Sequence, residues 1–333
     1  MAASAAGQVT MGNVVSAERS ASLLQRALGV KHAQDVRQLA TVGTYYALLA
    51  SMYFVPACRN VFFLVAACAY SFLTAVVGHN VLHQGMFDSK RRNVLFRYVL
   101  SFGALFPISA VIPSHNLVHH HFDDDGQPDW AAPEHVRFEW NLLNLLHFPN
   151  VAGPLTFNGV QRWARIQGRG EFRRQYMKEQ IFAFGLTGVL LAFDFWTALF
   201  FVVVPQLWGA RSFLRINILQ HDGADVESEW NHSRNFVGKL FNWFMMNNGY
   251  HTIHHNRAGM HWSELAAAHE REVVPRMDPS LDEKSMLAYL ARTYLFRFSR
   301  PRGKDVAAAE RAAAPVDIAS REVRRAEAEA EAC

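Results

Sequence analysis

The chain has 333 residues; half are hydrophobic, only 19% are charged, and 25 are phenylalanine. In soluble domains about a quarter of the residues are charged. The lower charged fraction here, together with apolar residues that are grouped into blocks, indicates a membrane protein. The net charge of +4 is too small to indicate a nucleic-acid-binding protein, and the three cysteines form no CxxC pair typical of a disulfide framework or thiolate zinc site.

The N-terminal part of the chain predicts a polar segment followed by a membrane hairpin. Residues 1–37 are rich in Ala and Ser and lack the order of a cleaved signal peptide, so we expect either a short interfacial helix or disorder there. An uncharged apolar block runs from Gln38 to Cys58, and a second runs from Val61 to Gly78. Each is close to the length of about 20 residues that crosses a hydrocarbon core. Only Arg59 and Asn60 separate them, which predicts a tight turn.

Basic residues flank this hairpin at both of its ends. Lys31 and Arg37 precede it, and the run from Lys90 to Arg92 follows it. Lys and Arg are enriched in cytoplasmic loops, so we expect both ends of the hairpin in the cytoplasm.

A third apolar stretch, Tyr98–Ser114, either spans the membrane or lies in it as a re-entrant or interfacial helix. Pro107 and Pro113 favour an interrupted segment over a straight span. Histidine clusters lie just before and just after it, so the stretch cannot cross if those clusters act together.

The second half of the chain predicts two more crossings between polar layers. Residues 121–179 are polar, and the apolar region Gln180–Ala210 is broken once, by Asp194. Histidines on both sides of this region can share a membrane face only after an even number of crossings, so we expect two spans that turn near Asp194. Residues 211–300 then form a second polar layer, and residues 301–333 form an Ala/Glu/Arg tail that is either an exposed helix or disordered.

The predicted fold is therefore an all-α integral membrane protein. It has four transmembrane helices in two hairpins, together with interfacial helices, and a cytoplasmic helical layer caps them. The membrane domain covers residues 38–300, and the histidine clusters lie in the cytoplasmic layer or at the ends of the spans.

Histidine is the unusual component of this sequence, with 16 residues. Residues three or four apart on a helix share a face, so spacing gives the clusters their meaning. Neutral imidazole is a good ligand for iron, copper or zinc. Four segments supply nine candidates, which suit two metals better than one tetrahedral zinc. The candidates are His79 and His83; His115, His119 and His120; His221; and His251, His254 and His255.

Other polar residues extend this predicted site. Asn217 lies four residues before His221 and is placed to hold a metal-bound water. His121 adjoins the second cluster and is a candidate to replace one of its neighbours. Acidic residues that follow the clusters either accept N–H bonds from the imidazoles or belong to solvated loops. These candidates are Asp125, Asp129, Asp222 and Asp225.

The H-x3-H, H-x3-HH and H-x2-HH boxes, in this order around two hairpins, resemble the membrane-bound fatty acid desaturase and hydroxylase superfamily. The segments Asn247–His255 and Gly259–Trp262 look like its third box, Asn217 and His221 match the Asn-x3-His element of acyl-CoA desaturases, and the resemblance covers roughly residues 38–300. It implies a di-iron centre held by the nine histidines on the cytoplasmic side, with O2 as co-substrate. No His-Pro-Gly-Gly haem motif occurs, so the electrons are expected from a separate carrier, a ferredoxin or a b-type cytochrome with its reductase.

This resemblance implies O2- and reductant-dependent desaturation of a fatty-acyl lipid, an acyl-CoA or a chain on an acyl carrier. A sibling oxygenase with the same ligands is the first alternative: an acyl hydroxylase, a carotenoid ketolase or an oxidative decarboxylase. The second alternative is a non-catalytic protein that binds or transports metal, for which ionisable residues would lie along a path within the spans. The Asn217/His221 element favours the desaturase.

Overall fold

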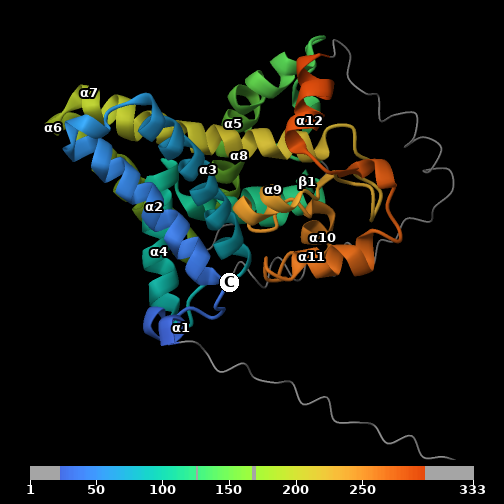
Figure 1. Cartoon of the computed structure of the whole chain (residues 1–333), viewed down its shortest axis with the longest axis horizontal. Helices are drawn as coiled ribbons and strands as arrows, with labels where there is room; N and C mark the ends of the chain where they lie inside the picture. The colour runs from blue at the N-terminus through green and yellow to red at the C-terminus, as the bar shows by residue number, and fades with distance from the viewer. Residues whose placement is uncertain (1–22, 125–126, 167–169, 297–333) are drawn as a thin grey trace, which may run out of the picture.

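A computed structural model describes residues 23–124, 127–166 and 170–296, and these residues are largely helical (Figure 1). The predicted tail 301–333 and residues 1–22 lie outside the described residues. The six long helices are α2 (Asp35–Phe54), α3 (Val61–His83), α4 (Lys90–Ala104), α5 (Asn141–Ile166), α6 (Gly170–Phe193) and α8 (Val204–His221).

Shorter elements fill the space beside the ends of the long helices. Strand β1 (Asp123–Asp124) pairs with β2 (Gln127–Pro128) in antiparallel fashion, and β3 (Asn235–Phe236) pairs with β4 (Asp282–Glu283) in parallel fashion. The short helices are α1 (Leu23–Leu28), α7 (Phe195–Ala198), α9 (Lys239–Phe244), α10 (His251–Asn256), α11 (Leu265–Ala268) and α12 (Met286–Leu290).

Helices α2 and α3 form the predicted hairpin. Arg59 and Asn60 stabilise the tight turn between them. The side chain of Asn60 accepts hydrogen bonds from the backbone N–H groups of Phe62 and Phe63, which caps the N-terminus of α3. The guanidinium of Arg59 donates to the carbonyl oxygens of Met52 and Tyr53 at the end of α2. Both residues therefore satisfy backbone groups that the helix ends leave unpaired.

The predicted interruption after Tyr98 is confirmed. Helix α4 ends at Ala104, and Leu105 adopts a left-handed backbone conformation with φ of 54°. The chain continues as a 3-10 turn, η2 (Ile108–Ala110), and a π-helical turn, η3 (Ile112–Val118). The two halves are bent by 94°, as in a broken span or a re-entrant segment.

A buried carboxylate on α6 holds this bend in place. Glu179 has no exposed surface and accepts hydrogen bonds from the hydroxyl of Ser101, from the amide of Gln175, and from both the backbone N–H and the hydroxyl of Ser109. Ser101 in turn accepts from the backbone N–H of Ile108. The bend therefore depends on one side chain to satisfy polar groups that the interrupted helix exposes.

Replacing Glu179 with alanine should lower the stability of the protein by on the order of 3 kcal/mol, because buried donors at Ser109 would lose their acceptor. Thermal unfolding of the detergent-solubilised protein would measure the change. Glu171→Ala is the matched control on the same helix, since its side chain is 92% exposed. Equal melting temperatures for the two variants would contradict this role of Glu179.

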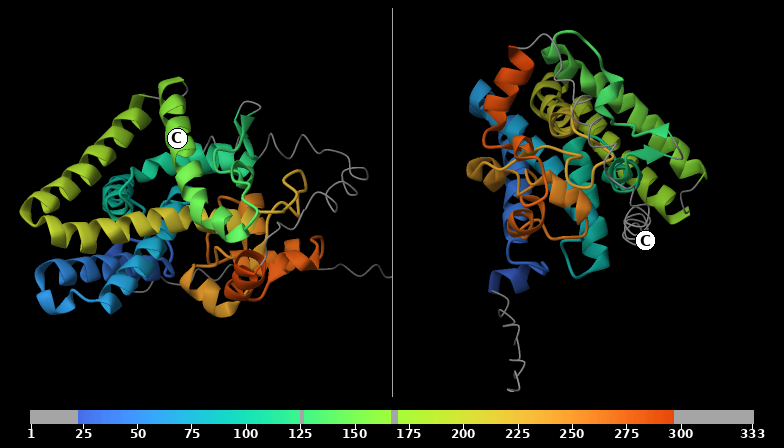
Figure 2. Two further views of the ribbon diagram at one scale, coloured as in Figure 1. Left: turned by 90° about the horizontal axis from the view of Figure 1, so that it is seen from above. Right: turned by 90° about the vertical axis from the view of Figure 1, so that its right-hand side faces the viewer.

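The second predicted turn, near Asp194, is also confirmed. Helix α6 ends at Phe193, and Asp194 accepts a hydrogen bond from the backbone N–H of Thr197 to cap α7. Figure 2 shows α6 and the α7–α8 helix diverging from this junction. The hydroxyl of Tyr53 donates to the carbonyl of Leu190 at 2.9 Å, which ties the second pair of helices to the first hairpin.

The number of membrane crossings is settled only in part. Within the described chain, two helices are long and apolar enough to span a membrane, Val61–His83 and Phe195–His221, or three if the bent pair Lys90–Ala104 with Ile108–His121 counts as one span. The crossings predicted for α2 and α6 remain predictions, and so does the cytoplasmic placement of the polar layers.

Candidate metal centre

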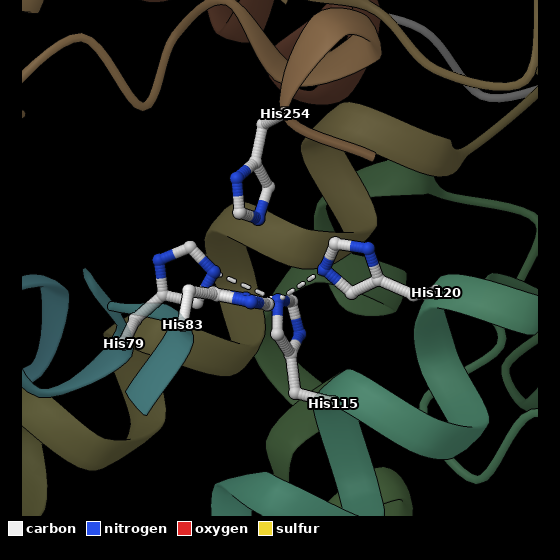
Figure 3. A group of neighbouring side chains, drawn as sticks. All are labelled: His79, His83, His115, His120 and His254. Carbon is white, nitrogen blue, oxygen red and sulfur yellow. Dashed lines mark hydrogen bonds between the residues drawn. The ribbon is translucent and has the colours of Figure 1, made fainter. Parts of the chain in front are cut away.

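Eight of the nine predicted histidines are buried and His115 is partly buried, and the fold collects all nine into two neighbouring groups. Within each group, the ring nitrogens that could bind a metal lie within 4.8 Å of one another. Five imidazoles from three parts of the chain converge in the first group (Figure 3). The first group is His79, His83, His115, His120 and His254, and the second is His119, His221, His251 and His255.

In the first group, helix α3 presents His79 and His83 one turn apart on the same face, as their spacing predicts. The Nε2 atom of His115 lies 2.7 Å from Nε2 of His79 and 3.0 Å from Nε2 of His120. His254 enters from α10 on the other side of the group.

The local helix type decides which group each histidine of the second box joins. His115 lies in the π-helical turn η3, and His119 begins a 3-10 turn, η4 (His119–His121). A π turn bonds residues five apart, so it brings His115 and His120 to one face. The ring of His119 still stacks on that of His115, with centroids 5.0 Å apart, but its ligand nitrogen belongs to the second group.

The third box is divided in the same way. His251 and His255 lie one α-helical turn apart on α10 and both belong to the second group, whereas His254 points to the first. Nε2 of His251 lies 2.8 Å from Nε2 of His221 and 3.2 Å from Nε2 of His255. Adjacent histidines, 119 with 120 and 254 with 255, therefore serve different groups.

The donor set fits two metal ions. The Nε2 atoms of His119 and His254 are buried and have no hydrogen-bond partner among the described residues. A buried polar atom is expensive to leave unpaired, and a nitrogen lone pair aimed at other imidazoles is a metal-binding arrangement. Groups of four and five imidazoles are typical donors for iron, copper or zinc.

The opposite nitrogens of two histidines in the second group are held in place by acceptors. Nδ1 of His119 lies 2.6 Å from a carboxylate oxygen of Asp129, and both side chains are at most 4% exposed. Nδ1 of His221 lies 3.1 Å from the carbonyl oxygen of His232. An acceptor at Nδ1 places the proton there and leaves Nε2 free to bind a metal.

The other predicted polar residues fall in different places. Asp222 accepts a hydrogen bond from the hydroxyl of Tyr294, and Asp225 accepts from the backbone N–H of Glu227 in its own loop. Asp125 lies outside the described residues. His121 belongs to neither group.

Phe122 is a contributor that the sequence analysis missed. Its backbone is left-handed, with φ of 60°, and its ring stacks on that of His255 with centroids 5.3 Å apart. It also meets the edge of His221. Its position directly after three histidines was the only available signal, because nothing in its residue type points to a metal site.

An apolar cleft touches both histidine groups. It lies between α3, α5 and α8, and its walls are mainly apolar, with Val76, Phe213 and Leu214 among them. Asn217 also lines the cleft, and its amide nitrogen donates to the carbonyl of Ala131 at 2.9 Å. An apolar wall beside buried ligand nitrogens can hold an aliphatic chain against the metal centre.

Burial lowers the pKa of His251, His254 and His255 well below the ordinary value of 6.5, and neighbouring histidines lower it further. These imidazoles are therefore neutral in the folded protein at neutral pH, the form that binds a metal.

The metal-free protein should lose stability as the pH falls below about 6.5. In that range the histidines of the unfolded chain bind protons, whereas the buried histidines of the folded protein stay neutral because their pKa is lowered. Above that pH the contribution is fully present. Melting temperatures of the chelator-treated protein between about pH 7.5 and about pH 5.5 would measure the effect. A flat profile over this range would contradict the lowered pKa values.

A comparison with protein families gives one match: the family model described as fatty acid desaturase covers residues 40–285 of the chain. No curated protein and no solved structure gives a significant match. All nine histidines lie within the matched residues.

Proposed function

The chain belongs to the fatty acid desaturase family, which implies an oxidoreductase that acts on a fatty-acyl lipid, and from this premise we propose that it is a membrane enzyme that desaturates the acyl chain at a di-iron centre. The nine histidines would hold the two irons. The reaction removes two hydrogen atoms from neighbouring methylenes and reduces one O2 to two waters, and it consumes two electrons and two protons.

The observation that carries the proposal is the cleft that reaches both histidine groups at once. His79 and His115 of the first group and His119 and His251 of the second all line it. A methylene pair lying there would be next to both metals. When bound, the irons supply the oxidising power that no side chain has, because they activate O2 with external electrons.

The protein's own residues orient the reactants and exclude water. Phe213, Leu214 and Ile216 form one apolar wall along α8, against which an extended acyl chain packs. Asn217 is held by its bond to Ala131, and its amide oxygen is placed to accept a hydrogen bond from a metal-bound water. We propose this water-mediated role for it.

The electrons come from a separate carrier, a ferredoxin or a b-type cytochrome with its reductase. We place the histidine groups on the cytoplasmic side of the membrane, where such carriers would reach them. Exposed basic residues from Lys90 to Arg92 at the start of α4 support this orientation, because they lie close to the histidine end of α3.

Expression in a host of defined lipid composition, followed by mass spectrometry of its acyl chains, tests the proposal. We expect a new double bond that depends on O2 and on a reductant, and no such product from the His254→Ala variant. A product with added oxygen would instead identify a hydroxylase of the same superfamily. Unchanged lipids, or equal products from the variant, would overturn the catalytic assignment.

A further inference from the structure

A second, smaller cleft reaches the first histidine group from another side. His83 and His254 lie in its wall. Its other walls include the polar side chains of Asp35, Gln38 and Asn80. None of these three lines the apolar cleft, so the first histidine group lies between an apolar and a polar cavity.

A buried carboxylate gathers three hydrogen bonds at this second cleft. One oxygen of Asp35 accepts from Nε2 of His261 at 3.1 Å, from the indole N–H of Trp262 at 3.1 Å and from the amide of Gln38 at 2.6 Å. Asp35 is only 2% exposed and His261 only 6%. These partners are 226 and 227 positions from Asp35 in the sequence, so the fold has to bring them together.

The hydrogen bonds continue in both directions from this carboxylate. Toward the metal centre, Asn80 donates to Gln38 at 3.2 Å, and Asn80 follows the metal-ligand candidate His79 directly in the chain. Toward the surface, Nδ1 of His261 lies 2.8 Å from the hydroxyl oxygen of the half-buried Ser263, and the ring of His32 stacks on that of His261 with centroids 4.0 Å apart. A line of polar groups therefore runs from the surface to the wall of the first histidine group.

The proposed reaction creates a need for such a route. Each O2 that is reduced to two waters takes up two protons from solvent in addition to the two hydrogen atoms of the substrate. The apolar cleft is filled by the acyl chain during the reaction, and no Asp, Glu, Lys or Arg side chain lines it. A separate polar entrance solves this problem without admitting bulk water beside the substrate.

We propose that the polar cleft is the proton entrance of the enzyme and that His261 and Asp35 form the relay at its mouth. The inference rests on the proposed function. A proton binds at Nδ1 of His261 as the proton on Nε2 passes to Asp35, so the charge of the ring is conserved. The carboxylic acid then releases that proton to water in the cleft, where Gln38 and Asn80 orient it. The ring of His261, which now carries its proton on Nδ1, makes a half-turn about its Cβ–Cγ bond to return a proton to the side of Asp35, and the second proton of the turnover then passes in the same way.

The first test measures access to the two clefts and needs no turnover. In iron-loaded protein whose cysteines are replaced by serine, single cysteines are introduced at Ala258 in the polar cleft and at Leu214 in the apolar cleft. A charged methanethiosulfonate should label the Ala258→Cys protein about tenfold faster than the Leu214→Cys protein, because thiolates form poorly in apolar surroundings. Equal rates, or faster labelling at Leu214, would overturn the proposal.

The second test uses His261→Ala with a matched control. His269 and Asp282 form another histidine–carboxylate pair, with 3.1 Å between Nε2 and the carboxylate, and His269 lines neither cleft. We expect His261→Ala to keep its iron, to lower kcat about 10- to 100-fold at unchanged KM, to release peroxide, and to regain activity with added imidazole. His269→Ala should show neither peroxide release nor imidazole rescue.

The outcomes separate this inference from the function on which it rests. A wild-type enzyme that forms no double bond would refute the proposed function. If the wild type is active, two results would refute the relay alone. The first is a His261→Ala variant that keeps the kcat of the wild type, and the second is a His261→Ala variant that imidazole activates no more than it activates His269→Ala.

Discussion

Alanine at His120 should remove one iron, and alanine at the neighbouring His119 should remove the other. The two side chains follow each other in the chain but point into different histidine groups. Each variant is expected to retain about one iron where the wild type holds about two, because the intact group keeps all of its imidazoles while the other group loses one of the donors that fix its coordination geometry. Both variants should form no product, because the proposed chemistry uses both metals.

X-ray absorption of the remaining iron distinguishes the two variants. His119→Ala should leave iron in the group of five imidazoles, and His120→Ala should leave it in the group of four. The double variant should bind none. His121→Ala is the natural control, since His121 belongs to neither group and its loss should leave both irons. Identical residual spectra from the first two variants would show that the histidines are not divided as described.

Asparagine at Asp129 should weaken metal binding in the second group by about 10- to 100-fold, the usual effect of losing the acceptor behind a ligating histidine. One carboxylate oxygen of Asp129 accepts from the backbone N–H of Ala131 and the other faces Nδ1 of His119. If the asparagine oxygen keeps the bond to Ala131, its NH2 group faces Nδ1. His119 would then carry its proton on Nε2, where the metal should bind.

Competition with a chelator, followed by iron analysis, would measure this loss. Asp225→Asn is a suitable control, because Asp225 caps a turn in its own loop at Glu227. Iron in the first group should be retained in both variants. Equal chelator resistance of the Asp129→Asn protein and the wild type would show that the carboxylate does not orient the ligand.

The sequence was sufficient to select the nine histidines and the main turns. Asn60, Pro107 and Asp194 each mark a place where a helix has to end, for reasons of capping or of the missing proline N–H, and the chain turns at or next to each of them. His79 and His83 share a group because α3 is a regular helix. These features depend on local geometry alone.

The division of the other boxes could not be read from spacing. His115 and His119 are four residues apart and their rings stack with centroids 5.0 Å apart, yet they belong to different groups, and the chain changes there from a π-helical to a 3-10 turn. The role of Asp129 could not be separated from that of Asp222 for a related reason. Both follow a histidine box, but distant packing turns Asp222 toward Tyr294.

The ends of the helices opposite the histidines have a consequence for regulation. The chain reverses there through short turns, at Pro56–Cys58 and at Asp194. Large aromatic side chains project beside these turns and are mostly exposed in the protein: Phe54, Phe62, Phe193 and Trp196. Aromatic residues of this kind settle at the lipid boundary, and among the described residues only the short turns lie beside them. We therefore expect a protein that contacts the described part of the chain from the aqueous phase to approach it from the histidine-bearing side.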